Sequence, residues 1–556
     1  MQAVWFDSGP ARRGRLFLAV HHLAVDGVSW RVLVPDLADA YAALAEGGRP
    51  APAPVGTSLR QWSRWMTERA EAADVVGELD HWRETLADRA APLGARALDP
   101  ARDVLATRRT LVSSVDGDTT AALLTEVTTA FHAGANDVLL AALALALRDW
   151  RRRRGHAAAP VLIDLEGHGR EEEAAPDADL SRTVGWFTSL YPVRLDPGVS
   201  EPAETWAAGQ AVATALRNVK EQLAAVPGKG LGFGLLRHLN PRTAPALAGP
   251  GGPDVLFNYL GRSLATRGEG AWSPARDGGA LAGHADPGAP FAHPLEINAL
   301  VHGDGEDGED GPRLAAEWSW PAGLFTEDEI RDLADTWSTA LRALAAHARR
   351  PGAGGHTPSD FPLARLEQQD VDEIEAACPD VEDVLPLTPL QEGLAFHAAY
   401  DDRAPDVYHV QIALDLNGEV DPGRLREAAE ALLRRHPPLR SCVRHRVSGG
   451  LVQVVRAEVP VPWRYLDLSG SDPDRQAARA REAVQDDLGR RFDLAEAPLL
   501  RLTLLRLGEG RHTLVVTNHH IVLDGWSMPL LLQELFAHYD SRGAGAPARP
   551  SGSWRG

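Results

Sequence analysis

The chain has 556 residues, of which 44% are hydrophobic and 24% charged, and its formal net charge is −20 at pH 7. This length exceeds one ordinary core and indicates about three compact units of about 100–200 residues each. The acidic balance argues against nonspecific nucleic-acid binding. Two cysteines, Cys378 and Cys442, argue against a secreted disulfide scaffold or a cysteine zinc site and fit a reducing cytoplasm.

The chain begins Met1-Gln-Ala-Val-Trp5, without the basic region and apolar stretch of a signal peptide. The longest apolar run, Val138–Leu147, is half as long as a bilayer span and is predicted to be a buried helix. We therefore expect no membrane association. A basic cluster, Arg148 with Arg151–Arg154, follows this run, and we interpret it as a solvated helix end.

A short pattern occurs twice in the chain. Both copies read HHxxxDG, with a serine two residues after the glycine, and they are His21–Ser29 and His519–Ser527. The offset of 498 residues holds without a gap as far as Tyr41 and Tyr539. A repeat of this length and regularity indicates two related structural units.

Each copy has the same predicted surroundings. Strand-like runs, Arg15–Val20 and His512–Thr517, precede the motif, and apolar residues spaced three and four apart follow it. Ser29 and Ser527 are predicted N-caps of these helices. Pro35 should kink or delay the first helix, because proline lacks the backbone donor. Each copy is therefore predicted to form a strand, a turn and a helix.

The motif places a histidine at the rim of a sheet. The turn that contains Asp26 and Gly27 returns a carboxylate toward His22, and a neutral imidazole accepts a proton near pH 7. This arrangement suits acyl-transfer or proton-transfer chemistry. The alternative is a pair of buried histidines satisfied by backbone partners. Zinc binding is disfavoured, because adjacent histidines on a strand point to opposite faces.

The first half resembles the epimerization domains of nonribosomal peptide synthetases, members of a condensation superfamily related to chloramphenicol acetyltransferase. The resemblance rests on five motifs: HHLAVDGVSW at His21–Trp30, DLEGHGRE at Asp164–Glu171, RTVGWFTSLYPV at Arg182–Val193, PGKGLGFG at Pro227–Gly234 and FNYLG at Phe257–Gly261. Their order is that of the family. The glycine run lacks GxxxxGK[ST] and is not interpreted as a phosphate loop.

The second half resembles the condensation domains of the same synthetases. It contains LTPLQEGLAFH at Leu387–His397, RHPPLR at Arg435–Arg440 and the second HHxxxDG copy. The opening motif and the preceding epimerization-type half imply a branch that accepts a D-configured donor. The resemblance also implies that the first domain lacks about a hundred residues before His21, and that the second stops before its later motifs.

The resemblance implies an α/β fold built from mixed α+β sandwich lobes of the chloramphenicol-acetyltransferase type, about three in tandem. Complete domains pair two lobes in a V around a substrate channel. Residues 1–105 are expected to be the remainder of a first lobe, 106–350 a second lobe, 351–384 a linker and 385–556 an incomplete first lobe of the next domain. Loops rich in glycine and acidic residues are predicted at 248–254, 266–290 and 303–312.

Roles for individual residues in the first half follow from the resemblance. His22 is expected to be one acid/base and Glu166 the group on the opposite face of the substrate, with a pKa raised by burial. Asn258 and Tyr259 are expected to line the site. The remaining motif residues are expected to be scaffold: His21, His168, Asp26 and Gly27.

In the second half, His520 is expected to accept a proton or to position an amine. Asp524 and Gly525 are expected to shape the motif loop, and His519 to support it. Arg435 and Arg440 resemble family positions packed near this loop and are predicted to pair with Asp524.

Neither reaction requires a metal or a directly bound cofactor. The resemblance implies that 4'-phosphopantetheine arrives on carrier-protein partners, next to adenylation domains, in the cytoplasm, without nucleic acid or membrane. Arg148–Arg154 is a candidate carrier-docking patch. The predicted function is epimerization of a carrier-tethered aminoacyl or peptidyl thioester, followed by condensation. Two alternatives are an acyltransferase that uses a soluble acyl donor and an inactive truncated fragment or docking segment.

Overall fold

The computed structural model describes residues 1–9, 14–87, 91–157, 159–171, 175–198, 206–207, 209–249, 252–262, 272, 286–303, 311–400 and 407–541. The chain divides into two compact units, Met1–Gly354 and Gly355–Gly556. In the loop expected at 248–254, all residues but 250 and 251 are described, and they lie outside helices and strands, whereas the loops expected at 266–290 and 303–312 lie largely outside the described residues.

The first unit is built on a mixed six-stranded sheet. Its strands, in spatial order, are β3 (Arg108–Val115), β8 (Arg313–Pro321), β7 (Leu295–His302), β6 (Val255–Arg262), β4 (Val161–Gly167) and β5 (Ser189–Leu195). The β4–β6 and β6–β7 pairs are parallel, and the other pairs are antiparallel. The parallel ladder brings the ends of β4 and β6, which are far apart in the sequence, to one level of the sheet.

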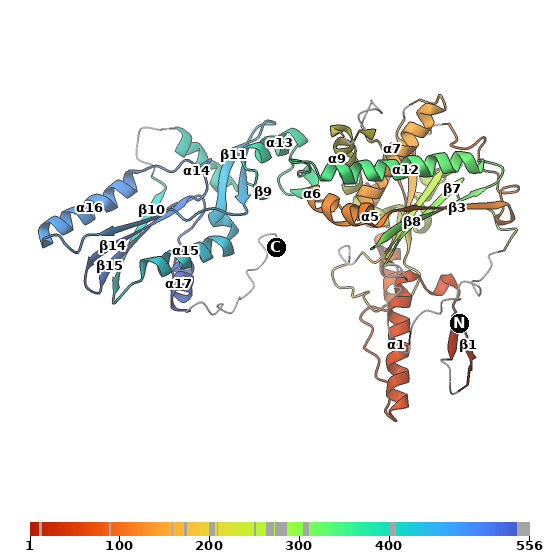
Figure 1. Ribbon diagram of the computed structural model, residues 1–556, viewed down its shortest axis with the longest axis horizontal. Helices are drawn as coiled ribbons and strands as arrows, with labels where there is room; N and C mark the ends of the chain where they lie inside the picture. Colours follow the sequence, from red (N-terminus) through yellow and green to blue (C-terminus); the bar gives the residue numbers. More distant parts are fainter. Residues whose placement is uncertain are drawn as a thin grey trace. The chain divides into compact units, whose positions relative to one another are not determined.

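Helices cover one face of this sheet. The long ones are α7 (Ala135–Arg153), α9 (Gln210–Ala224) and α12 (Glu327–Ala348), and α7 packs against both of the others, as Figure 1 shows for α12. All residues of Val138–Leu147 are buried, which confirms the predicted buried helix. Ile163 and Leu165 of β4 pack into this core, so the alternate residues Asp164 and Glu166 belong to the other face, which we call the open face.

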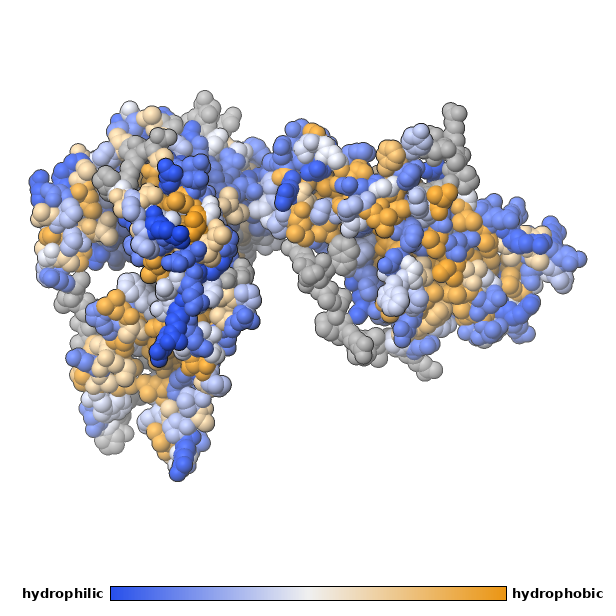
Figure 2. All heavy atoms as spheres, turned by 180° about the vertical axis from the view of Figure 1, so that it is seen from behind, coloured by the Kyte–Doolittle hydropathy of each residue, from blue (hydrophilic) through white to orange (hydrophobic). Residues whose placement is uncertain are grey.

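The start of the first unit contains a small sheet and a helix. β1 (Gln2–Phe6) pairs antiparallel with β2 (Arg15–Ala19), a 3₁₀ helix spans His22–Ala24, and α1 (Gly27–Ala45) follows. Apolar side chains are exposed here, and Figure 2 shows hydrophobic residues at the surface of this part. Residues 1–105 and 106–350, expected as separate lobes, fall in one unit.

Short elements complete the first unit. Its remaining helices are α2 (Leu59–Arg69), α3 (Ala73–Gly77), α4 (Leu79–Leu86), α5 (Gly117–Ala122), α6 (Thr128–Ala130), α10 (Leu231–Gly234) and α11 (Ala244–Leu247). One-turn 3₁₀ segments span Leu105–Thr107 and Pro227–Gly230, and π-helical turns span Leu123–Val127 and Leu235–Leu239.

The second unit holds two sheets. The four-stranded one has the order β10 (His409–Asn417), β15 (Arg511–His519), β14 (Leu500–Gly508) and β13 (Trp463–Asp467), and the three-stranded one β11 (Ser441–His445), β12 (Leu451–Arg456) and β9 (Val381–Pro386). Its helices are α13 (Gln368–Ala377), α14 (Pro389–Tyr400), α15 (Pro422–Arg435), α16 (Pro473–Gly489) and α17 (Ser527–Asp540), with 3₁₀ turns at Pro358–Asp360 and Pro437–Arg440.

Of the segment 351–384, expected as a linker, residues 355–384 are folded within the second unit. Its helix α13 buries Val371 and Ile374, and its strand β9 pairs with β12. Phe361 joins the same hydrophobic cluster. The segment therefore contributes to a core. The sequence feature that indicates this is the apolar face of the short acidic helix α13.

The predicted strand, turn and helix form in both HHxxxDG copies, but the caps differ from the prediction. The N-cap of α1 is Asp26, whose side chain accepts the N–H of Ser29, so Ser29 lies at the third helical position. Ser527 is the first residue of α17, and its N–H donates to Asp524. Pro35 lies inside α1 and does not delay its start. A carboxylate satisfies the free helical N–H as well as a hydroxyl does, which explains the shift.

The two copies have different surroundings. β15 lies between β10 and β14, whereas β2 pairs with β1 alone. Leu535 of α17 is buried at 2% exposure, whereas its counterpart in α1, Leu37, is 36% exposed. The same local sequence therefore forms a strand, a turn and a helix both beside a two-stranded sheet and within a four-stranded one.

In the part of the chain that the structure describes, no single helix is both long and apolar enough to cross a membrane. One bent helix pair, Gly117–Ala130 with Ala135–Arg153, meets that criterion by length and composition when taken together, with a bend of 105°.

Candidate active site

The first histidine of each motif holds its own loop. In the first copy, His21 Nδ1 accepts the N–H of Leu23 at 3.1 Å, and in the second, His519 Nδ1 accepts the N–H of Ile521, also at 3.1 Å. His519 is fully buried, whereas His21 is exposed. The repeated contact shows what these two side chains do in the loop: each satisfies a backbone donor at the turn.

Asp26 is the centre of a buried hydrogen-bond network. Its carboxylate accepts the N–H of Ser29 at 2.7 Å and pairs with the Arg170 guanidinium at 3.1 Å. It also accepts the N–H of Phe187 at 3.2 Å. Burial opposes ionisation of Asp26, but the contacts with Ser29, Arg170 and Phe187 outweigh it and hold the pKa of the carboxyl below its ordinary value. Asp26 thereby joins the motif loop to two distant segments.

Arg170, from the DLEGHGRE motif, reaches this network because of the backbone before it. Gly169 has φ +66°, and a Cβ there would lie 1.6 Å from the carbonyl oxygen of Phe187. Only glycine permits this approach. The Arg170 guanidinium then lies 4.1 Å from the centroid of the Phe187 ring and donates to the Leu180 and Thr183 carbonyls.

Glu166 and Asn258 meet on the open face of the sheet. They extend from the neighbouring strands β4 and β6, and Asn258 Nδ2 donates to Glu166 Oε2 at 2.7 Å. Burial raises the pKa of Glu166, and Glu296 raises it further, whereas His22 and His293 lower it. A half-buried carboxyl with a raised pKa is suited to exchanging a proton near neutral pH.

His22 is electrostatically coupled to Glu166, although 144 residues separate them in the chain. The His22 ring lies 5.1 Å from the ring of Trp186, centroid to centroid. Trp186 is 48% exposed and belongs to the RTVGWFTSLYPV motif. The site therefore combines an exposed imidazole, an indole and a carboxyl–amide pair from separate segments.

Tyr259 is placed differently from Asn258. It packs against the hydrophobic cluster on the helix-covered face, as alternation along β6 requires, and burial raises its pKa. The structure thus brings Asn258 and Glu166 together and directs Tyr259 away from them. The sequence motif names both residues, but strand alternation separates their side chains.

His293 is a residue of the open face that the motifs did not indicate. Its Nε2 lies 2.8 Å from Asp164 Oδ2, and both residues are buried. Asp164 is two residues before Glu166 on β4, so the pair closes the open face on that side of Glu166. No local signal marks His293, because it precedes β7 and meets β4 only in the folded sheet.

The glycines of PGKGLGFG serve packing. Gly230 has φ +84°, and a Cβ there would lie 2.1 Å from the Tyr191 ring. At Gly232 a Cβ would lie 1.9 Å from Glu78 Oε2. Lys229, the one cation of the run, is 3.6 Å from Glu171. These contacts agree with the interpretation that the run is not a phosphate loop.

In the second unit, His520 is exposed and oriented by its own loop. Its Nδ1 lies 2.6 Å from the carbonyl oxygen of Leu523. A carbonyl oxygen only accepts, so Nδ1 carries the hydrogen and Nε2 is left as the acceptor. Gln391, from LTPLQEG, donates to the carbonyl of Ile521 at 3.0 Å and ties the opening motif to this loop.

The arginines of RHPPLR bind elsewhere than predicted. Arg440 is buried and pairs with Glu382 at 2.6 Å, and it donates to the carbonyls of Leu433 and Ala457. Arg435 pairs with Glu534 at 3.1 Å. Asp524 instead accepts a hydrogen bond from the N–H of Ser527. The hydrogen bonds from Ser527, and to a smaller extent the charge of His520, hold the pKa of Asp524 below its ordinary value. The predicted pairing with Asp524 is replaced by these contacts.

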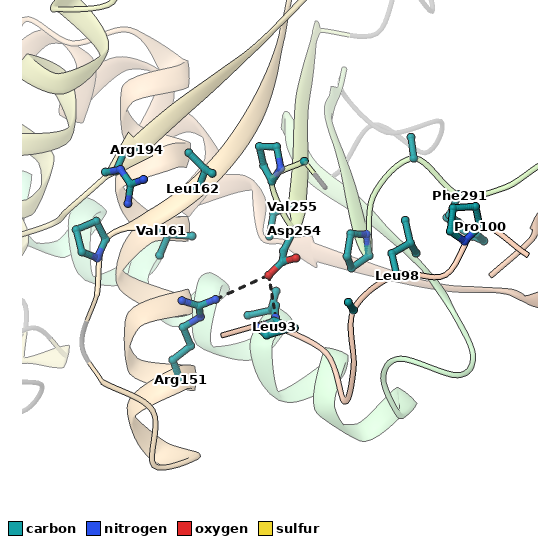
Figure 3. Close-up of a pocket in the computed structure, with 17 residues that line it drawn as sticks. Leu93, Leu98, Pro100, Arg151, Val161, Leu162, Arg194, Asp254, Val255 and Phe291 are labelled. Carbon is teal, nitrogen blue, oxygen red and sulfur yellow. Dashed lines mark hydrogen bonds and ion pairs between the residues drawn. The ribbon is translucent and has the colours of Figure 1, made fainter. Parts of the chain in front are cut away.

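A separate pocket of about 610 Å³ lies at the other end of β4, at Val161 and Leu162. Figure 3 shows Arg151 and Asp254 pointing toward one another in it, with Leu93 beside them. Because Glu166 lies near the opposite end of β4, this pocket is separate from the carboxyl–amide pair.

The basic cluster at the end of α7 is largely paired. Arg148 binds Asp196 at 2.8 Å, Arg153 binds Asp149 and Asp332, and Arg154 binds Asp332 at 3.0 Å. Within the described ranges, no group of three or more His, Cys, Asp or Glu residues could hold a metal ion.

The fold agrees with comparisons to known proteins. The family model described as "Condensation domain" matches residues 9–366 and 381–552. This chain belongs to the condensation domain family, and it has the condensation-domain fold related to chloramphenicol acetyltransferase.

Individual relatives are similar over nearly the whole chain. One of the linear gramicidin synthase proteins of Brevibacillus parabrevis is 37% identical over 98% of this chain, and bacitracin synthase 3 of Bacillus licheniformis is 32% identical over 95%. The chain spans only 7% and 8% of their respective lengths. The crystal structure of the epimerization domain from the third module of tyrocidine synthetase B matches with a TM-score of 0.50 and 30% identity, over 60% of this chain and 70% of that one.

Proposed function

We propose that the first unit epimerizes the α-carbon of an aminoacyl or peptidyl thioester carried on the phosphopantetheine arm of a carrier protein, within a nonribosomal peptide synthetase. The similarity to a solved epimerization domain supports this, as do relatives named as linear gramicidin synthase and bacitracin synthase. The observation that carries the proposal is the pairing of Glu166 with Asn258 within the electrostatic influence of His22: the carboxyl and the imidazole can each exchange a proton, and the amide orients the carboxyl.

Epimerization removes the α-proton and returns it on the opposite face. The thioester makes that proton more acidic, and the developing enolate oxygen requires a hydrogen-bond donor. In the proposed reaction Glu166 and His22 exchange the proton on the two faces of the α-carbon. One takes it as the base and the other returns one as the acid, so no net proton is consumed.

The electrostatics of Glu166 fit this role. Burial raises the pKa of the carboxyl, so that it binds a proton more readily than an exposed glutamate does. Asn258 donates to one carboxyl oxygen, which fixes the orientation of the group and leaves the other oxygen to the substrate. Asp26 and Arg170 act as positioning residues for the motif loop that carries His22.

The test is α-proton exchange. A carrier-tethered aminoacyl thioester is incubated with the protein in D₂O, and deuterium incorporation and chirality at the α-carbon are measured. We expect exchange with the wild type and a loss of at least about a hundredfold with His22→Ala or Glu166→Gln. Near-normal exchange by either variant refutes the role of that residue. Racemic product without either side chain refutes the proposal.

A matched control uses the exposed carboxylate Glu373 of α13. Glu373→Gln removes the same charge far along the chain and should leave exchange unchanged. Incubation with soluble acyl donors distinguishes the alternative acyltransferase: transfer from them without α-proton exchange supports that function. Inactivity toward both substrate types supports an inert fragment.

For the second unit we propose the condensation reaction, in which an acceptor amine attacks a donor thioester. His520 is the group that meets the amine, with Nε2 as its free acceptor. Holding two tethered reactants together supplies a further part of the rate. Dipeptidyl product on a carrier protein, lost with His520→Ala and retained with Ser469→Ala on an exposed turn, tests this assignment.

A further inference from the structure

The pocket at the start of β4, which we call the β4 pocket, is large enough for a small molecule. Its volume of about 610 Å³ falls within the usual range for small-molecule sites, about 300–1,000 Å³. It lies between the segment that begins at Pro92, the starts of β4 and β6, and the residues that precede β7 (Figure 3). All of these belong to the first unit.

The wall of the β4 pocket is mainly apolar and offers few backbone donors. Of the 17 residues that line it, five are prolines, which have no backbone N–H: Pro92, Pro100, Pro160, Pro253 and Pro294. Leucine, valine, alanine and phenylalanine side chains make up most of the rest. Such a wall favours an apolar group and leaves polar recognition to a few charged side chains.

Two of these charged side chains have opposite signs. Figure 3 shows Arg151 and Asp254 pointing toward one another inside the pocket. Arg151 Nη2 and Asp254 Oδ2 are 4.0 Å apart, which is too far for a hydrogen bond. Asp254 Oδ2 instead accepts the N–H of Leu93 at 2.8 Å. A cation and an anion therefore lie side by side without a direct hydrogen bond between them.

The Arg151 guanidinium is buried, and its charge is incompletely compensated. Its side chain is 9% exposed, and among the residues that the structure describes it makes one hydrogen bond, from Nη2 to the carbonyl of Ala91 at 3.1 Å. A guanidinium has five N–H donors, so most of them are left for water or a ligand. Burial lowers the pKa of Arg151, and Asp254 opposes this shift only in part.

A free α-amino acid with an apolar side chain is complementary to these groups. Its carboxylate and its ammonium are bonded to the same α-carbon, so the two charges can meet Arg151 and Asp254 together. A carboxylate can bind a guanidinium through two parallel hydrogen bonds, and an ammonium pairs with a carboxylate. A ligand with one charge alone would place that charge near a side chain of like sign, which is unfavourable.

We propose that the β4 pocket binds a free α-amino acid with an apolar side chain. Its carboxylate lies on Arg151, its ammonium on Asp254, and its side chain among the prolines and aliphatic groups of the wall. An amino acid held as a thioester has no free carboxylate, so these charges select a free amino acid over a carrier-tethered one. The site is separate from the carboxyl–amide pair and does not depend on the proposed epimerization.

Calorimetric titration of the full chain tests this proposal. L-leucine is the probe, and three compounds each lack one of its features: leucinamide lacks the carboxylate, 4-methylpentanoate lacks the ammonium and glycine lacks the side chain. We expect leucine to bind with a Kd of about 1 mM or lower. Each of the other three compounds should bind at least about tenfold more weakly, because each loses an ion pair or the apolar contact.

Two variants and one control locate the site. Arg151→Gln removes the cation and should weaken leucine binding at least about tenfold. Arg152→Gln is the matched control, since the neighbouring Arg152 side chain is 50% exposed, pairs with Asp149 and does not line the pocket. Ala97→Trp fills the pocket from an exposed position of its wall, and it should abolish binding without removing a charge. Melting curves without ligand confirm that each variant is folded.

Three results would overturn the inference: no leucine binding by the wild type, equal affinity for leucine and for leucinamide or 4-methylpentanoate, or full leucine affinity in Ala97→Trp. The last variant keeps the test decisive if Arg151→Gln does not fold. A wild type that binds leucine but exchanges no α-proton on tethered substrates supports this site and contradicts epimerization alone.

Discussion

Asp26 and Arg170 form a buried ion pair, 3.1 Å apart, between the first HHxxxDG loop and the strand-end segment that follows Glu166. Their side chains are 5% and 8% exposed. Because Asp26 also caps α1 and holds the N–H of Phe187, one carboxylate fixes the relative position of three segments. The distance between His22 and Glu166 therefore depends on a residue that belongs to neither side of the proposed proton transfer.

Asp26→Asn should destabilise the first unit by about 3 kcal/mol, because it leaves the Arg170 guanidinium buried without its carboxylate. Chemical denaturation followed by tryptophan fluorescence measures the free energy of unfolding. Asp36→Asn is the control, since the Asp36–Arg182 pair is about one-third exposed and should contribute no more than about 1 kcal/mol. Equal losses for the two variants would contradict the buried network.

The same pair predicts a pH dependence. The pKa of Asp26 is lowered in the fold, so its stabilisation is fully present above the ordinary aspartate pKa and is lost as the pH falls through the lower, folded value. The wild type should therefore lose stability in acid more steeply than Asp26→Asn does. Melting temperatures of both proteins between neutral pH and about pH 3 test this. Parallel curves would show that the carboxylate is not stabilised.

The pH dependence of the stability that Glu166 contributes should have the opposite sign to that of Asp26. Its pKa is raised by burial, so the stability it contributes is present below the ordinary glutamate pKa and declines as the pH rises through the folded value. Glu166→Gln should be more stable than the wild type at pH 8, and this advantage should shrink in acid. Glu373→Gln, at an exposed position, should show no such dependence. A constant difference at every pH for Glu166→Gln argues against a raised pKa.

The two histidines of the second motif should differ in their effect on stability. His519→Ala removes a fully buried ring and leaves the N–H of Ile521 without its acceptor, which should cost about 2 kcal/mol or more. His520→Ala removes an exposed ring and should change the free energy of unfolding by less than about 1 kcal/mol. Urea unfolding of both variants measures this. A larger loss of unfolding free energy for His520→Ala than for His519→Ala would contradict the assignment of His519 as the scaffold residue and His520 as the reactive one.

Two glycines of PGKGLGFG provide another matched pair. Gly230→Ala forces a side chain into left-handed backbone against the Tyr191 ring and should cost about 2 kcal/mol or more. At Gly234 the backbone is helical and a Cβ has open space, so Gly234→Ala should stabilise the protein by up to about 1 kcal/mol. Thermal melting separates the two. Similar melting temperatures would mean that the ring moves aside.

Local patterns of residues were sufficient to predict the local elements and the family. The HHxxxDG repeat predicted a strand, a turn and a helix in both copies, and these form because the pattern of apolar residues and the acidic cap act over a few residues. The apolar run Val138–Leu147 likewise predicted a buried helix, since its composition permits no exposed face. The caps were misassigned, because serine and aspartate compete for the same backbone donors.

Tertiary structure alone decided which side chains meet. The FNYLG motif names Asn258 and Tyr259 together, but alternation along β6 sends one to Glu166 and the other to the helix-covered core. The contact of His293 with Asp164 depends on how segments far apart in the chain meet in the folded sheet, and this leaves no local signal. The partners of Arg435 and Arg440 were mispredicted for the same reason, since several carboxylates were available and the packing of the second unit selected Glu534 and Glu382.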